Sequence, residues 1–163
     1  MSHIRGLHHN AYRCRDSEET RRFYEDFLEL PLTEAFEIQQ TRTGRNTRVL
    51  HSFYQMDDGS FLAFFEAPDQ AFEFKEQHDF DLHIALEVED ATLHRMLAKG
   101  KTAGIPTRGI ANHGFVQSVY FRDPDGYVLE LTAKLPAHDS AMDRHTNNAR
   151  GKLDEWQAAK RAS

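Results

Sequence analysis

The segment HNAYRCRD, residues 9–16, is repeated as HIALEVED at residues 83–90. In both segments a strand-like run begins with histidine and reaches aspartate seven residues later, immediately before a helical pattern. The copies also end alike, because MDDGSFLAFFE (residues 56–66) is answered by RDPDGYVLELT (residues 122–132), each with an Asp-Gly turn that leads into a closing strand. This internal repeat indicates two copies of one structural module.

Each copy continues from its aspartate into a helical pattern. Asp16 and Glu19 have the spacing of a capping box, and Gly100 stands where a helix end commonly needs a left-handed residue. The apolar faces of the two helices are Phe23, Tyr24, Phe27 and Leu28 in the first copy and Leu93, Met96 and Leu97 in the second. We therefore predict an α+β fold of two tandem βαβββ modules, with a C-terminal helical tail.

The boundaries follow from the repeat. The modules span about residues 3–67 and 79–134, joined by a linker at 68–78, and together they form one domain over residues 1–134. Residues 135–163 form a helical appendage, which we expect to pack through Leu153 and Trp156.

Composition and charge exclude several classes of protein. The 163 residues carry a formal net charge of −6 with the basic residues scattered, so no electropositive stripe is available for a nucleic-acid backbone. The apolar runs are too short to cross a bilayer, and the N-terminal segment lacks the apolar core of a signal peptide. We therefore expect a cytoplasmic protein whose partner is a small molecule. The one cysteine, Cys14, excludes an internal disulfide and is expected to be buried.

The repeat also predicts a metal site. Side chains alternate along a strand, so His9 and His83 occupy matching faces of their modules. Each helix covers one side of its sheet, and the other sides are expected to form a shared cup in which the two histidines face each other. Glu130 lies in an apolar strand, where a carboxylate is costly to bury without a cation. Two imidazoles and one carboxylate are a ligand set that suits Fe(II) or Mn(II) and leaves positions open.

The repeat places an alanine where a fourth ligand would stand. Subtracting the offset of the Asp-Gly turns, 130 − 67 = 63, gives Ala63, which cannot bind a metal. Ala63 shares its strand face with Phe61 and Phe65. That corner of the cup is therefore predicted to be vacant, aromatic-lined and suited to a flat ligand.

The segments GLHHNAY (residues 6–12), DLHIALEVED (81–90) and SVYFRDPDGYVLEL (118–131) resemble the vicinal oxygen chelate superfamily, which includes glyoxalases, fosfomycin-inactivating thiol transferases and extradiol dioxygenases. The resemblance covers residues 4–133. It implies paired βαβββ modules and the metal ligands His9, His83 and Glu130.

Within that superfamily the motifs are most similar to the ring-cleaving dioxygenases. Their pattern has a tyrosine ten residues before the glutamate and a basic residue seven before that tyrosine, which here are Tyr120 and His113. The resemblance implies an Fe(II)-dependent oxidoreductase that uses dioxygen to cleave a catechol-like or hydroquinone-like ring, as in aromatic compound catabolism. Tyr120 and His113 would then manage the protons.

Two other functions stay open. A non-oxidative metalloenzyme of the glyoxalase or fosfomycin-resistance thiol transferase type would use the same ligands with Mn(II) or Zn(II), and Arg13 and Arg122 could then contact an anionic substrate. A metal-free binding protein of the same fold is the third interpretation. In every case we expect a homodimer, because paired sheets leave edges and apolar faces that symmetric association covers.

Overall fold

The computed structural model describes residues 3–76 and 78–162, and for residue 162 the backbone alone. The first module contains β1 (His9–Cys14), α1 (Ser17–Arg21), its π-helical continuation η1 (Arg22–Phe27), β2 (Leu32–Gln40), β3 (Asn46–Gln55) and β4 (Phe61–Glu66). The second contains β5 (His83–Glu87), α2 (Asp90–Thr102), β6 (Thr107–Asn112), β7 (Val116–Arg122) and β8 (Val128–Lys134). The tail contains α3 (His138–Met142) and α4 (Ala149–Ala162).

The two modules have the same strand permutation. The first sheet has the order β1-β4-β3-β2 and the second the order β5-β8-β7-β6. In each, the strand that begins with histidine pairs in parallel with the closing strand of its own module, and the other pairings are antiparallel. The predicted α+β fold of two βαβββ modules is therefore confirmed.

One face of each sheet is covered by helix, and these covered faces share a core. Phe23, Tyr24 and Phe27 of the first helical segment belong to the same buried cluster as Leu93 and Met96 of α2. Burying one such side chain stabilises the fold by roughly 1.5–3 kcal/mol. The helices therefore hold the modules together as well as covering their own sheets.

A buried hydrogen bond also joins the modules. The Tyr24 hydroxyl donates to Oδ2 of Asp123 over 2.9 Å, and Oδ1 of Asp125 accepts the backbone N–H of Arg15 over 2.9 Å. Burial raises the pKa of Asp123 to about 6, because a desolvated carboxylate is unfavourable.

The end of α2 differs from the sequence prediction. Gly100 lies inside the helix and is buried, while Gly104, with φ of +70°, is the left-handed residue after the helix end. A Cβ on Gly100 would lie 2.5 Å from Oγ1 of Thr107 and 2.6 Å from Cε1 of Phe121. Glycine is therefore required at position 100 for close packing of the helix on β6 and β7.

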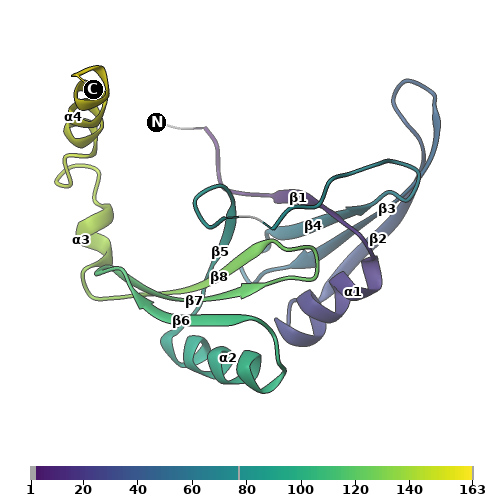
Figure 1. Cartoon of the computed structure of the whole chain (residues 1–163), viewed down its shortest axis with the longest axis horizontal. Helices are drawn as coiled ribbons and strands as arrows, with labels where there is room; N and C mark the ends of the chain where they lie inside the picture. Colours follow the sequence, from purple (N-terminus) through teal and green to yellow (C-terminus); the bar gives the residue numbers. More distant parts are fainter. Residues whose placement is uncertain (1–2, 77, 163) are drawn as a thin grey trace.

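The tail does not pack as predicted. Helix α4 forms over the expected residues, but Leu153 and Trp156 are 49% and 65% exposed. Figure 1 shows α3 and α4 rising away from the sheets at one end of the molecule. A helical pattern with two apolar residues predicts the helix without specifying what it contacts. Among the described residues, no helix is long and apolar enough to span a membrane.

The uncovered faces of both sheets lie on one side of the molecule. In Figure 1 α1 and α2 lie beneath their sheets, on the same side, so the open faces look the other way. Along β1, His9 and Ala11 are exposed while Cys14 is buried, as this arrangement requires. The residues on these two open faces form the candidate site.

Candidate metal centre

Two of the three predicted ligands meet on the second sheet. His83 begins β5 and Glu130 lies in the neighbouring β8, with Ala85 of β5 in register opposite Glu130. Nε2 of His83 is 3.3 Å from Oε2 of Glu130, although the glutamate is only 7% exposed. The parallel pairing of the first and last strands of the module therefore brings these two groups together.

The donor set fits a divalent cation. Nδ1 of His83 lies 2.7 Å from the carbonyl oxygen of Asp79, and a carbonyl can only accept, so in the neutral ring Nδ1 carries the proton. In that tautomer Nε2 has its lone pair on the side of the Glu130 carboxylate. Two acceptors facing each other at this distance are stabilised by a cation between them, and ligand histidines usually have their second nitrogen held in this way.

Tyr120 lies beside Glu130, and His113 lies beside Tyr120. The Tyr120 hydroxyl donates to Oε1 of Glu130 over 3.3 Å and is 2.9 Å from Nε2 of His113. Burial, together with the negative charge of Glu130, holds the pKa of Tyr120 above its usual range, so the phenol keeps its proton at neutral pH. Of the two residues suggested by family resemblance, Tyr120 therefore contacts the carboxylate and His113 contacts Tyr120.

A cation also lies on this face. The Arg108 guanidinium carbon is 4.2 Å from the centroid of the Tyr120 ring, and the guanidinium pairs with the carboxylate of Asp79. Asp79 also supplies the carbonyl that holds His83. Sequence reasoning missed Arg108, because no motif marks it and its position depends on the pairing of β6 with β7.

His9 lies on the other sheet. Its Nδ1 is 2.8 Å from Nδ1 of His8, and its ring centroid is 5.4 Å from that of Phe53. Among the described residues, no group of three His, Cys, Asp or Glu side chains is placed to hold a metal ion. His9 therefore does not join His83 and Glu130 within one chain, which leaves a site shared between two copies as the arrangement in which the two histidines could face each other. The reason is that the open faces lie side by side, since the helix-covered faces share one core.

The face around His9 is aromatic. His9 is in register with Phe61, and Phe61, Ala63 and Phe65 follow one another on the same face of β4. Sequence reasoning missed Phe53 and His51 of β3, which lie opposite Ala63 and Phe65. The repeat contained the signal for Phe53, because subtracting the offset from Tyr120, 120 − 67 = 53, reaches it. His51 had no such counterpart, since the same subtraction relates it to Ser118.

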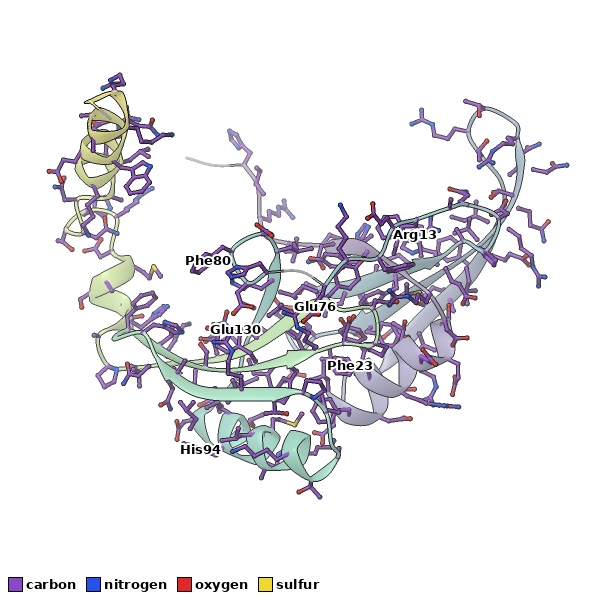
Figure 2. All side chains as sticks on the ribbon, viewed as in Figure 1. Arg13, Phe23, Glu76, Phe80, His94 and Glu130 are labelled. Carbon is purple, nitrogen blue, oxygen red and sulfur yellow. The ribbon has the colours of Figure 1, made fainter. Side chains whose placement is uncertain are left out.

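Arg13 has a different role from the predicted contact with substrate. Its guanidinium donates to the carbonyl oxygens of Ala67 and Gln70 over 3.0 and 2.8 Å and lies over the ring of Phe72. In Figure 2 Arg13 lies on the first sheet, well away from Glu130 on the second. It fastens the linker to the edge of the first sheet. Arg122 is likewise engaged, by the Gly126 carbonyl and the Glu76 carboxylate.

Comparisons with known proteins agree with the fold. A family model described as the Glyoxalase/Bleomycin resistance protein/Dioxygenase superfamily matches residues 6–131. The metallothiol transferase FosB of Shouchella clausii is 28% identical over 132 residues, which cover 78% of this chain and 80% of that protein.

Solved structures share the fold at low identity. A mutant of the fosfomycin resistance protein FosX from Listeria monocytogenes, complexed with Mn(II) and 1S,2S-dihydroxypropylphosphonic acid, has a TM-score of 0.63 at 18% identity, covering 84% of this chain and 98% of that one. The antibiotic-binding protein TnmS3 from a Streptomyces species has a TM-score of 0.60 at 18% identity, covering 83% and 100%.

Proposed function

The chain belongs to the Glyoxalase/Bleomycin resistance protein/Dioxygenase superfamily, and on that premise we propose that it is a metal-dependent enzyme with non-oxidative chemistry, adding a nucleophile such as a thiol to a small electrophile. The observation that carries this proposal is the 3.3 Å approach of His83 Nε2 to Glu130 Oε2, with the Tyr120 hydroxyl on the other carboxylate oxygen. The similarity to FosB supports non-oxidative chemistry in preference to ring cleavage.

The proposed ligands are His83 and Glu130 of one chain and His9 of a second copy. A divalent metal held there, Mn(II) in the first instance, would supply Lewis acidity toward a substrate oxygen. Opening an epoxide with a thiol forms a C–S bond, breaks a C–O bond and moves the thiol proton to the new alkoxide. Tyr120, which hydrogen-bonds both Glu130 and His113, is the side chain suited to carry that proton.

The proposal needs two copies of the chain because His9 does not reach His83 in one. A second copy rotated by 180° over the open side would place its first sheet opposite the second sheet, and the symmetry would generate two identical sites. Exposed apolar side chains are available to be covered by such an association. They are Leu7, Phe36, Phe80 and Ile110, which are 58%, 45%, 93% and 38% exposed.

A second candidate is an Fe(II)-dependent dioxygenase that cleaves a hydroxylated ring. The observation in its favour is the aromatic face around His9, where Phe53, Phe61 and Phe65 would suit a flat substrate. This dioxygenase would use the same ligands and Tyr120. The identity of the metal and the consumption of dioxygen therefore distinguish it from the first candidate.

Metal titration is the first test. Purified metal-free protein is titrated with Mn(II) by calorimetry, with His83→Ala and Glu130→Gln as ligand variants. His94→Ala, an exposed histidine on α2 (Figure 2), is the matched control. We expect the wild-type protein to bind one ion per chain and both ligand variants to lose at least about 100-fold in affinity. A further variant, His8→Ala, removes the partner of His9 and should lose about tenfold. Unchanged affinity in both ligand variants contradicts the site.

Activity separates the two candidate reactions. The Mn(II)-loaded protein is incubated with fosfomycin and L-cysteine, and the loss of free thiol is followed together with the NMR spectrum of the product. In parallel, the Fe(II)-loaded protein is given catechol and hydroquinone in an oxygen electrode. Thiol consumption without oxygen uptake supports the first candidate, and oxygen uptake with a ring-opened product supports the second. Failure to bind any metal would favour the metal-free binding interpretation.

A further inference from the structure

A groove of about 580 Å³ lies between the two modules, on the side that carries the helices. Its walls are the segment after η1, the turn between β3 and β4, the end of β5 and the start of α2. Its floor consists of partly buried apolar side chains that pack against the shared core, namely Leu28, Leu30, Met56, Leu86 and Val88. An apolar groove of this size is typical of a surface that binds another element or molecule.

The rim of this groove is acidic. Beside the single guanidinium of Arg95, the lining includes five carboxylates, those of Glu29, Asp57, Asp58, Glu87 and Glu89. Glu29 and Glu87 pair with cations of their own chain. Asp57 in the turn and Glu89 at the start of α2 are exposed, so their charges face solvent. The groove therefore suits an apolar partner that also carries positive charge.

Helix α4 has the complementary pattern. Leu153 and Trp156, which are 49% and 65% exposed, share one face because they are three residues apart. At about 100° per residue, three basic residues lie on or beside this face, namely Arg150, Lys152 and Lys160, and two acidic residues lie farther round the helix, namely Asp154 and Glu155. A basic amphipathic helix of this kind commonly binds in an apolar groove.

The groove and α4 lie on opposite sides of their own chain. The groove adjoins α2, and Figure 1 shows α4 on the other side of the sheets from α2. The tail leaves the second sheet at Lys134, the end of β8, and rises away from the helices through α3. With the tail in this arrangement, the α4 that fills a groove comes from a second copy.

We propose that α4 of one copy binds in the groove of a second copy. Leu153 and Trp156 lie on the apolar floor, and the basic side chains of the helix face the acidic rim. Two copies that exchange their tails make two identical contacts, so the association closes as a dimer. None of the candidate metal ligands lines the groove. This contact therefore goes beyond the proposed function and does not depend on it.

The fluorescence of Trp156 tests the proposal, because it is the single tryptophan of the chain. The acceptor is the full chain with Leu153→Ala and Trp156→Ala, which has no tryptophan and a tail that cannot fill a groove. Wild-type protein, diluted until its emission is that of an exposed tryptophan, is titrated with this acceptor. We expect a saturable shift of the emission to shorter wavelength, because Trp156 leaves water.

Charge variants locate the contact. An acceptor that also carries Asp57→Lys and Glu89→Lys should bind the wild-type tail at least about tenfold more weakly. Lys152→Glu in the tail should restore binding to that acceptor, which would also show that the acceptor is folded. Glu155→Gln, on the other face of α4, is the matched control and should leave the affinity unchanged.

Four results would overturn the proposal. They are no shift with the acceptor, equal binding of the wild-type tail by both acceptors, a short-wavelength emission that dilution does not change, and a shift produced by anionic phospholipid vesicles but not by the acceptor. The third result would mean that α4 binds in the groove of its own chain, and the fourth that it binds membranes. Mn(II) titration measures the metal site separately, so either proposal can fail alone.

Discussion

Each predicted ligand histidine has its Nδ1 next to a protein group. Nδ1 of His83 lies against the Asp79 carbonyl and Nδ1 of His9 against His8. The remaining nitrogen, Nε2, is therefore the one free to bind a metal in both repeats. His8, which precedes β1, thus matters through its contact with His9.

Replacement of Tyr120 tests proton transfer by a single side chain. Replacing it with phenylalanine removes the hydroxyl that hydrogen-bonds Glu130 and His113 and leaves the ring beneath Arg108. We expect kcat to fall by about 100-fold, with Mn(II) affinity changed by less than about tenfold. Steady-state kinetics on the substrate that the wild type turns over, with calorimetry of the metal, measure both. An unchanged kcat would remove Tyr120 from the mechanism.

Asp123 gives a pH prediction for stability. Its pKa is raised from 3.8 to about 6 in the folded protein, so the folded state binds the proton more tightly than the unfolded state. The free energy of unfolding should therefore fall as pH rises from about 4 to 6, by up to about 3 kcal/mol, and this contribution stays lost above pH 6.

Asp123→Asn isolates that effect. The amide oxygen can still accept the N–H groups of Asp125 and Tyr127, and its nitrogen can donate to the Tyr24 hydroxyl. Urea unfolding at pH 4.5 and 7.5 should show a smaller loss of stability in the variant than in the wild type. Equal losses in the two proteins would show that Asp123 is not the group responsible.

Close packing at Gly100 of helix α2 contributes to the stability of the protein. A residue with a Cβ at position 100 meets Thr107 and Phe121, so Gly100→Ala should lower the free energy of unfolding by about 1–3 kcal/mol, despite the better helix propensity of alanine. Lys101→Ala, at an exposed neighbouring position, should change it by less than about 0.5 kcal/mol. Denaturant unfolding of the two variants measures the difference. A Gly100→Ala protein as stable as the wild type would contradict this packing.

Most elements could be predicted, and the exceptions have physical causes. Period-two and period-3.6 patterns, repeated twice in one chain, indicate strands and helices because each element must bury one face. Helix α2 runs past Gly100, whereas the sequence suggested that it ends there. Glycine occurs both at helix ends and where a helix packs closely on a sheet, and residue order alone does not distinguish the two cases. Whether α4 packs against the rest of the chain was not predictable, because Leu153 and Trp156, which are exposed, need a tertiary partner to pack against.

The assembly can be tested by complementation between inactive chains. His9→Ala and Glu130→Gln should each lose tight metal binding alone. In a mixed dimer of the two, one site combines both altered residues and the other combines none. Random mixing makes half of the dimers mixed, so about a quarter of the wild-type metal capacity should return.

The measurement is metal content after the two tagged variants are unfolded together, refolded and dialysed against limiting Mn(II). The separately refolded variants, mixed only afterwards, are the control. A site built within one chain predicts no recovery in either sample. Recovery in the co-refolded sample alone would establish that two chains share each site.

Residue order alone predicts the modules, the strand faces and the identity of the metal-ligand candidates. It could do so because alternation along a strand and repetition along the chain are local properties that residue order records. His83 and Glu130 follow from them, since a parallel first and last strand is part of the repeated unit.

Which groups meet depends on tertiary packing. The separation of His9 from His83, the engagement of Arg13 with the linker, and the positions of Arg108 and His51 all depend on how distant segments pack. The shared core fixes the open faces side by side, because buried apolar side chains of both modules belong to one cluster. No pattern in residue order specifies that arrangement, because it arises from contacts between the two repeats.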